Sequence, residues 1–286
     1  MRVKTIKFLP RAVAFLDILG FKDLVRDAHV NAVALRRLSQ LMCKIRSNEP
    51  LNRVLNSTVP RNLHPKSLEV SDSVILSAPL TDSHHSWYSG LAVTVMRCSQ
   101  IAAILLEEGY LVSGAVNIGP AQHTQRNILG VAYQDAYEWQ SKVHNPAIVL
   151  CPEAATAWQA SPYRVGSSDL CLKRAAEFKD KNINGTQTLK KHETIIVNPF
   201  EPTYMNSVRS LDKRATAPKL DDAWLSARIE RIEELVRGNL AQHAPGSPTQ
   251  KPSAYTKWQW FDKLFREFGR PRMEEHLSLP MSLVTA

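Results

Sequence analysis

The feature that most restricts the fold is a short apolar segment, AVAFLDILGFKDLV (12–25), that carries a carboxylate at its centre. Residues 12–17 have the composition of a buried strand, and the two-residue strand period puts Val13, Phe15 and Asp17 on one face. A carboxylate is costly to bury without a partner. Asp17 therefore predicts either a cap for the helix that follows or a cationic group at the end of the strand.

Strands and helices alternate along the first half of the chain. Apolar periodicity predicts strands at 12–17, 110–119 and 147–151, a strand pair within 68–77, and helices at 21–46, 89–108 and 131–142. This order is typical of a ferredoxin-like α+β fold, in which helices pack on one face of an antiparallel sheet. We expect a main domain at 1–200 and a helical C-terminal extension at 201–286.

The C-terminal extension has a different pattern. Residues 221–240 form an amphipathic helix that Asp221 or Asp222 caps, and a Pro-rich linker follows at 242–254. Aromatic residues then recur at helical spacing in YTKWQWFDKLFREF (255–268). We expect this last segment to dock on the main domain and to stabilise it.

Composition excludes several classes of protein. The net charge of +9 suits a polyanionic partner, but no nucleic-acid-binding motif accompanies it, so we expect no nucleic acid partner. No apolar run reaches the ~18 residues of a membrane span, no secretory pattern is present, and we expect a cytoplasmic protein. Four cysteines without a CxxC pair predict reduced core thiols rather than a zinc site or disulfides.

A second carboxylate interrupts an apolar pattern in LEVSDSVILS (68–77), at Asp72. Neighbouring strands lie ~5 Å apart, so the Asp17 and Asp72 carboxylates could meet, and they would repel each other without a cation between them. Magnesium bound with a phosphate substrate fits two carboxylates. Each acid alone is explained more simply, Asp17 as a helix cap and Asp72 as a turn residue; the pair favours a metal site.

A glycine follows the first carboxylate. In ILGFK, Gly20 lets the chain turn from the strand into the helix, so the first amides of the helix can face an anion. Lys22 adds a positive charge there. The strand, acid, glycine turn and helix together predict a site for a triphosphate and a metal ion.

Four segments, FLDILGFKDLV, VSDSVILSAP, SGAVNIGPAQH and LGVAYQDAYEWQ, follow one another over residues 8–150. In these segments the chain resembles the pyrimidine nucleotide cyclases of bacterial anti-phage (Pycsar) signalling, a branch of the class III adenylate and guanylate cyclase superfamily. The first two segments are the specific ones. The aromatic KWQWF at 257–261 is similar to the carboxyl-terminal segment of such proteins.

The resemblance implies a ferredoxin-like cyclase domain that works as a homodimer, with active sites at the subunit interface. It implies that Asp17, Asp72 and the backbone carbonyl of Ile18 hold two Mg²⁺ or Mn²⁺ ions. One ion would favour deprotonation of the attacking 3′-hydroxyl, and the other would neutralise the departing pyrophosphate.

The resemblance also implies a substrate and a product. Leu19, Gly20 and Phe21 would offer N–H groups to the β- and γ-phosphates of a nucleoside triphosphate, with UTP favoured or CTP. The product would be the 3′,5′-cyclic monophosphate, which acts on a downstream effector in anti-phage defence.

The chain departs from the purine cyclases at the positions that read the base. Where these cyclases carry a lysine four residues before the second acid, the chain has Leu68, and Lys66 lies two residues too early. Where they carry an asparagine and an arginine on the fourth helix, it has Gln134 and Glu138. These departures disfavour ATP and GTP.

The departures leave the cation that stabilises the transition state unassigned, because Ser113 stands where relatives often have an arginine. The candidates are Arg97, within an apolar helix, Arg126, in the loop after His123, and, less favoured, Lys142. His123 matches a histidine that is common in this loop of the family. Each of these side chains has a plain alternative as a solvated surface residue.

Three alternative functions remain open at this stage. A purine cyclase would share the fold and the metal site. A non-catalytic nucleotide sensor would keep the fold but lose the chemistry, and the presence of both Asp17 and Asp72 argues against it. A nucleic-acid-binding protein rests only on charge and on the aromatic residues of KWQW.

Overall fold

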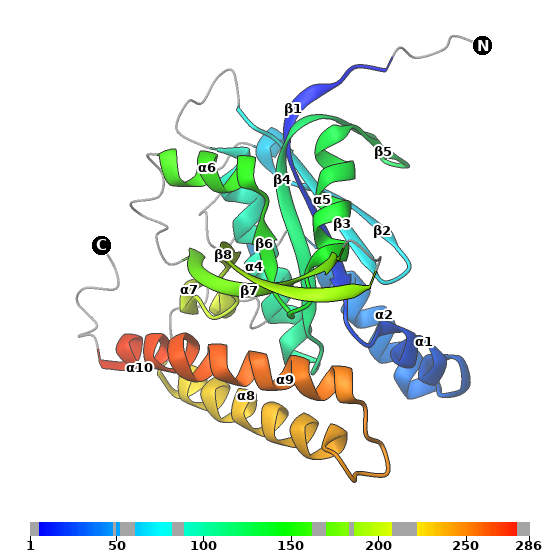
Figure 1. Ribbon diagram of the computed structural model, residues 1–286, viewed down its shortest axis with the longest axis vertical. Coiled ribbons are helices and arrows are strands. Elements are labelled where there is room, and N and C mark those ends of the chain that lie inside the picture. The colour runs from blue at the N-terminus through cyan, green and yellow to red at the C-terminus, as the bar shows by residue number, and fades with distance from the viewer. Residues whose placement is uncertain are drawn as a thin grey trace.

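The computed structural model describes residues 6–47, 50–51, 61–81, 89–161, 170–182, 186–207 and 222–278. Within these residues the chain forms one mixed sheet with strand order β2-β3-β1-β4-β6-β8-β7, as Figure 1 shows. The strands are β1 (Leu9–Ile18), β2 (Lys66–Val70), β3 (Ser73–Pro79), β4 (Val112–His123), β6 (Ile148–Leu150), β7 (Cys171–Lys181) and β8 (Gln187–Val197), and the short β5 (Ile128–Leu129) pairs with β4.

The first four of these strands form the expected ferredoxin-like unit. β1 lies between β3 and β4, β3 pairs with β2, and all three pairings are antiparallel. β6 is parallel to β4 and extends the sheet, and the antiparallel β8 and β7 complete it. The fold is therefore α+β with a mainly antiparallel sheet, as the order of elements in the sequence predicts.

Helices cover both faces of this sheet, which corrects the expectation of helices on one face. The apolar face that includes Ala14 and Leu16 packs with α1 (Phe21–Val30), α2 (Ala32–Arg46) and α4 (Gly90–Glu107). The opposite face, with Val13 and Phe15, packs with α5 (Val131–Lys142) through Ala132 and Ala136. The small side chains of these two alanines let α5 pack closely on the strands. Because α5 contributes so few apolar residues, the sequence did not indicate that a helix covers this face.

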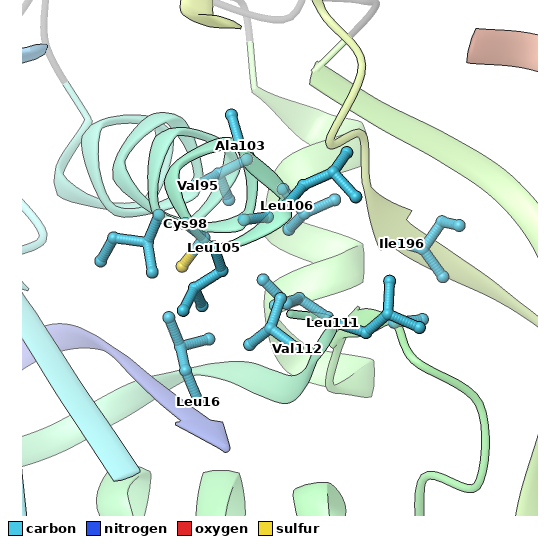
Figure 2. Packing of buried hydrophobic residues seen from close by; sticks show 14 of the residues in the cluster. Leu16, Val95, Cys98, Ala103, Leu105, Leu106, Leu111, Val112 and Ile196 are labelled. Carbon is cyan, nitrogen blue, oxygen red and sulfur yellow. The ribbon is translucent and has the colours of Figure 1, made fainter. Parts of the chain in front are cut away.

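The main core lies between β1 and α4. Figure 2 shows Leu16 of β1 facing Cys98 and Leu105 of α4, with Val112 of β4 beside them, and each of these side chains is buried. α4 alone among the described helices is long and apolar enough to cross a membrane by length and composition, yet 89% of its apolar window is buried inside the protein. It is the central core helix.

Three local features differ from the sequence expectations. The helix at 21–46 is broken at Asn31, whose backbone is extended and whose side chain accepts from the amides of Val33 and Ala34 to cap α2. The β7–β8 hairpin was not predicted, because its strands are largely polar on both faces. Of the four free cysteines, Cys98 and Cys151 are buried as expected, whereas Cys43 is exposed.

The C-terminal extension packs against the main domain, as expected. It comprises α8 (Asp222–His243), α9 (Pro252–Leu264), a π-helical turn (Phe265–Gly269) and α10 (Arg270–Ser278), and in Figure 1 α8 and α9 run side by side next to the β7–β8 hairpin. Phe200, which follows β8, is fully buried and lies 5.3 Å from Phe261 and 5.5 Å from Phe265 between ring centres. The short α6 (Pro152–Ala160) and α7 (Pro202–Ser207) complete the described helices.

Candidate active site

Asp17 is the next-to-last residue of β1, where neighbouring strands flank it on both sides. It lies opposite Ser73 of β3 and Ser113 of β4 in the sheet register. Because Val13 and Phe15 contact the α5 side of the sheet, strand alternation puts Asp17 on that side as well. The side chain is half-buried, so it is neither a core residue nor a freely solvated one.

Asp72 lies in the two-residue turn that joins β2 to β3, rather than in a strand. Val70 pairs with Ser73 across this turn, and Ser71 adopts a positive φ of 57°. The turn lies against the end of β1, since the amide of Ile18 donates to the carbonyl of Asp72 at 2.9 Å. The turn interpretation of Asp72 is thus correct for the backbone, and the same turn brings Asp72 beside Asp17.

The negative charge of Asp72 acts on Asp17. Burial raises the pKa of Asp17, and the negative charge of Asp72 raises it further. Three lysines oppose this effect on the pKa of Asp17: Lys257, Lys179 and Lys22. The strand end thus holds two acids in a partly dry position where a bound cation would favour their charged forms.

The donor set at this position fits a magnesium or manganese ion that arrives with a phosphate ligand. The described residues contain no cluster of three or more histidine, cysteine or acidic side chains, so a complete protein cage for a metal is not found among them. Mg²⁺ needs only one or two carboxylates when phosphate oxygens and water supply the rest. Asp17 and Asp72 meet that requirement, and Ile18, between Asp17 and the glycine turn, is the third expected ligand.

The glycine turn opens α1. Gly20 has a φ of 86°, in the left-handed region that favours glycine, and a Cβ there would meet no atom within 4 Å. The backbone conformation requires the glycine, and the space in front of it is open to a ligand. The amide of Leu19 already donates to the carbonyl of Leu111 at 2.9 Å, so this amide does not face a phosphate. The expected row of three amides is reduced to those of Gly20 and Phe21.

A cleft of about 640 Å³ borders this turn, and we call it the Gly20 cleft. Its walls are Leu19 and Gly20, one side of α1 with Asp23 and Asp27, the loop at 108–111 with Glu108, one side of α8 and the start of α9. The C-terminal extension therefore forms one wall of the cleft, and the turn of the main domain forms the other.

Two lysines near Asp17 were not predicted from the sequence. They are Lys179 of β7 and Lys257 of α9. Their positive charges act on Asp17, and they also lower the pKa of His144, although burial is the largest cause of that shift. Sequence spacing gives no reason to connect Asp17 with residues so far along the chain. The one available signal is the position of Lys257 next to Trp258, which is buried and anchors its helix.

Arg97 does not join this group. Its guanidinium is 1% exposed and donates to the carbonyls of Ile45 at 2.6 Å and Ser47 at 2.5 Å, so it binds the C-terminal end of α2. These hydrogen bonds offset the cost of burying a charged guanidinium in an apolar helix. They give Arg97 a structural role, and its expected role as the catalytic cation has no support in this arrangement.

Arg126 lies at the opposite end of the sheet from Asp17. It is exposed in the turn after β4, whereas Asp17 pairs with the beginning of that strand. His123, at the end of β4, lies ten residues from Ser113, or about 33 Å along a strand. Arg126 could therefore reach an Asp17 site only from a second subunit.

Three other residues from the sequence analysis have defined contacts. His123 is buried rather than solvated, and its Nδ1 lies 2.8 Å from the Ser77 hydroxyl. Lys66 donates to the carbonyl of His123 at 3.3 Å, at the same distant end of the sheet. Lys142 pairs with Glu138 at 2.6 Å and lies over the Trp139 ring.

Comparisons with known proteins identify similar structures only. No family model and no curated protein matches the chain. The catalytic core of a rhodopsin-guanylyl cyclase with converted specificity, in complex with ATPαS, has a TM-score of 0.42 and 11% identity over 68% of this chain and 98% of its own. An adenylate/guanylate cyclase/hydrolase from Silicibacter pomeroyi has a TM-score of 0.37 and 14% identity over 68% of this chain and 99% of its own.

A third structure, a class III adenylyl cyclase-like ATP-binding protein from Pseudomonas aeruginosa, has a TM-score of 0.34 and 15% identity. The match covers 52% of this chain and only 35% of that protein. Similarities of this size do not establish a shared activity.

Proposed function

We propose that the protein is a metal-dependent nucleotide cyclase that converts a pyrimidine nucleoside triphosphate to its 3′,5′-cyclic monophosphate and pyrophosphate. The observation that carries the proposal is the position of Asp17 at the end of β1, beside the turn that holds Asp72 and shortly before an open glycine turn. Two acids and an anion-binding turn are the groups that a metal-bound triphosphate needs.

Asp17, Asp72 and the carbonyl of Ile18 would hold the metal. When bound, Mg²⁺ or Mn²⁺ supplies positive charge at the attacking and departing oxygens. The amides of Gly20 and Phe21 and the ammonium of Lys22 would orient the β- and γ-phosphates. The 3′-oxygen forms its bond to the α-phosphorus as the bond to the pyrophosphate oxygen breaks, and the hydroxyl proton leaves to solvent.

The pyrimidine preference rests on the resemblance of the sequence motifs to pyrimidine cyclases and on the lack of the purine-reading pattern. Leu68 of β2 lies against the apolar cluster under α5, and the nearby Lys66 is engaged by the carbonyl of His123. Leu68 has no ammonium, and the ammonium of Lys66 lies at the end of the sheet distant from Asp17. The proposed role in anti-phage signalling has the same basis.

A homodimer is part of this proposal. Arg126 lies at the far end of the sheet from Asp17, so a site that uses Arg126 needs a second subunit. Analytical ultracentrifugation at micromolar concentration tests this directly: we expect a dimer with or without nucleotide, and a monomer contradicts the shared site.

The decisive test is incubation of the purified protein with each of the four ribonucleoside triphosphates and Mn²⁺, followed by identification of the products by mass. We expect cyclic UMP or cyclic CMP as the main product. A cyclic purine nucleotide as the main product overturns the pyrimidine preference. The absence of any cyclic product, with phage extract also present, overturns the cyclase proposal and favours a nucleotide sensor of the same fold.

A further inference from the structure

We propose that the C-terminal hairpin of α8 and α9 forms part of the ligand site, and that Lys257 binds the phosphate chain of an anion seated at the Gly20 turn. The inference rests on the proposed function for the identity of the nucleotide, but the anion site itself follows from the cleft. Its ligand class is a polyphosphate.

The Gly20 cleft places Lys257 opposite the glycine turn. Lys257 and Trp258 line the cleft from α9, and Leu19 and Gly20 line it from the main domain. Apart from Gly20 and its two chain neighbours, no atom of the described residues lies within 4 Å of the position that a Gly20 Cβ would occupy. The amides of the first turn of α1 and an ammonium from α9 thus border one open space.

Two lysines of the hairpin have different roles. Lys251, just before α9, pairs with Asp23 of α1 at 2.6 Å. This pair neutralises the acid in the first turn of α1, which would otherwise repel an anion there. Among the described residues, no carboxylate lies within ion-pair distance of Lys257, so its charge is available to a ligand.

Lys179 of β7 lies near enough to Lys257 to act on it, although it lines a neighbouring cavity and not the Gly20 cleft. Burial, and then the positive charge of Lys179, lower the pKa of Lys257, and Asp17 opposes them. Lys179 donates to the carbonyl of Ser141 at 3.5 Å, which keeps it on the α5 side of the site. An anion bound beside Lys257 would reduce the repulsion between the two lysines.

The position of Lys257 is fixed by packing. Its neighbour Trp258 is 5% exposed, and Phe261, one turn further along α9, is 3% exposed. The rings of these two residues lie 5.7 Å apart. Because this packing already orders the backbone of α9, Lys257 can bind a ligand without the further cost of ordering a loop.

The test is calorimetric titration of the full-length protein with inorganic tripolyphosphate at low salt, with and without Mg²⁺. We expect Lys257→Gln to weaken binding by roughly tenfold or more, because a charge-assisted hydrogen bond is lost. Lys257→Arg should keep most of the affinity. The matched control is Lys263→Gln, since Lys263 is an exposed lysine of the same helix, 3.8 Å from Glu267, and it should bind as the parent does.

A second measurement does not depend on the folding of a variant. Lysine acetylation of the unmodified chain, read by mass spectrometry, should be slower at Lys257 when tripolyphosphate is present and unchanged at Lys263. Parent-like binding by Lys257→Gln, or equal acetylation of Lys257 with and without tripolyphosphate, overturns the inference. If no nucleotide is cyclised but Lys257 still governs tripolyphosphate binding, the anion site stands and the proposed function fails.

Discussion

The two ends of β1 carry opposite charges, and they differ in whether the charged group is hydrogen-bonded. Arg11 and Asp17 lie on the same face of the strand, about 20 Å apart. Arg11 is 6% exposed and donates to the Ser77 hydroxyl at 3.0 Å and to the Ser77 carbonyl at 3.1 Å. Among the described residues, the Asp17 carboxylate makes no hydrogen bond and no ion pair, although three lysines lie near enough to act on its pKa.

The difference indicates that Arg11 is a structural group, whereas Asp17 is a group that binds a ligand. The hydrogen bonds to Ser77 compensate the Arg11 guanidinium for its loss of water, so Arg11 itself needs no ligand. Partial burial and the charge of Asp72 both disfavour the ionised form of Asp17, and no hydrogen bond among the described residues offsets them. An uncompensated carboxylate of this kind is typical of a site that binds a cationic ligand.

The largest effect that tests this comparison is on activity. Asp17→Asn keeps the shape of the side chain but removes its charge, so we expect turnover in the nucleotide assay to fall by at least about a thousandfold. Asp72→Asn should behave in the same way. Circular dichroism should show a folded protein in both cases, and an unfolded variant would make the residue structural.

The next effect is the pH dependence of stability at the Arg11 end. Burial, and then the charges of Arg11 and Lys66, lower the pKa of His123 to about 4. The unfolded chain therefore binds the proton more tightly, and stability falls as the pH drops from about 6.5 towards 4, by up to about 3 kcal/mol. Urea titrations across this range should be steeper in pH for the parent than for His123→Gln, and equal slopes would contradict the prediction.

A smaller effect is expected when the hydroxyl that links Arg11 to His123 is removed. Ser77→Ala leaves Arg11 Nε and His123 Nδ1 without this partner in a fully buried position. The free energy of unfolding should fall by about 1–3 kcal/mol, while turnover per folded molecule stays as in the parent. A large loss of turnover without a loss of stability would mean that the two ends are not separate.

The smallest effect is on the stability of the Asp17 end. Because the pKa of Asp17 is raised by folding, its ionised form costs stability once the pH exceeds the pKa in the folded protein. Asp17→Asn should therefore melt at or slightly above the temperature of the metal-free parent at pH 7. A clear decrease in Tm, measured by calorimetry with a chelator present, would show that the carboxylate stabilises the fold.

The sequence was sufficient for the features that depend on neighbouring residues. The acid, glycine and helix of 17–21 are local, and the order of strands and helices follows from periodicity. The turn at Asp72 was open to two interpretations, since Ser71, Asp72 and Ser73 suit a turn and also interrupt a strand pattern. Backbone pairing of Val70 with Ser73 decides between them.

The parts that could not be predicted depend on contacts between distant segments. Lys257 reaches the site because Trp258 and Phe261 bury α9 against the main domain, and no local pattern encodes which surface they cover. Arg97 was an attractive catalytic cation because its helix is otherwise apolar. The carbonyls that engage it belong to α2, some fifty positions earlier in the chain, so its structural role becomes visible only in the folded protein.

The two-residue turn between β2 and β3 has a consequence for how this sequence can vary. Inserting one residue between Val70 and Ser73 would shift the hairpin register or displace Asp72 from the amide of Ile18. We expect natural variants to exchange the identity of Ser71 while conserving the length of this loop.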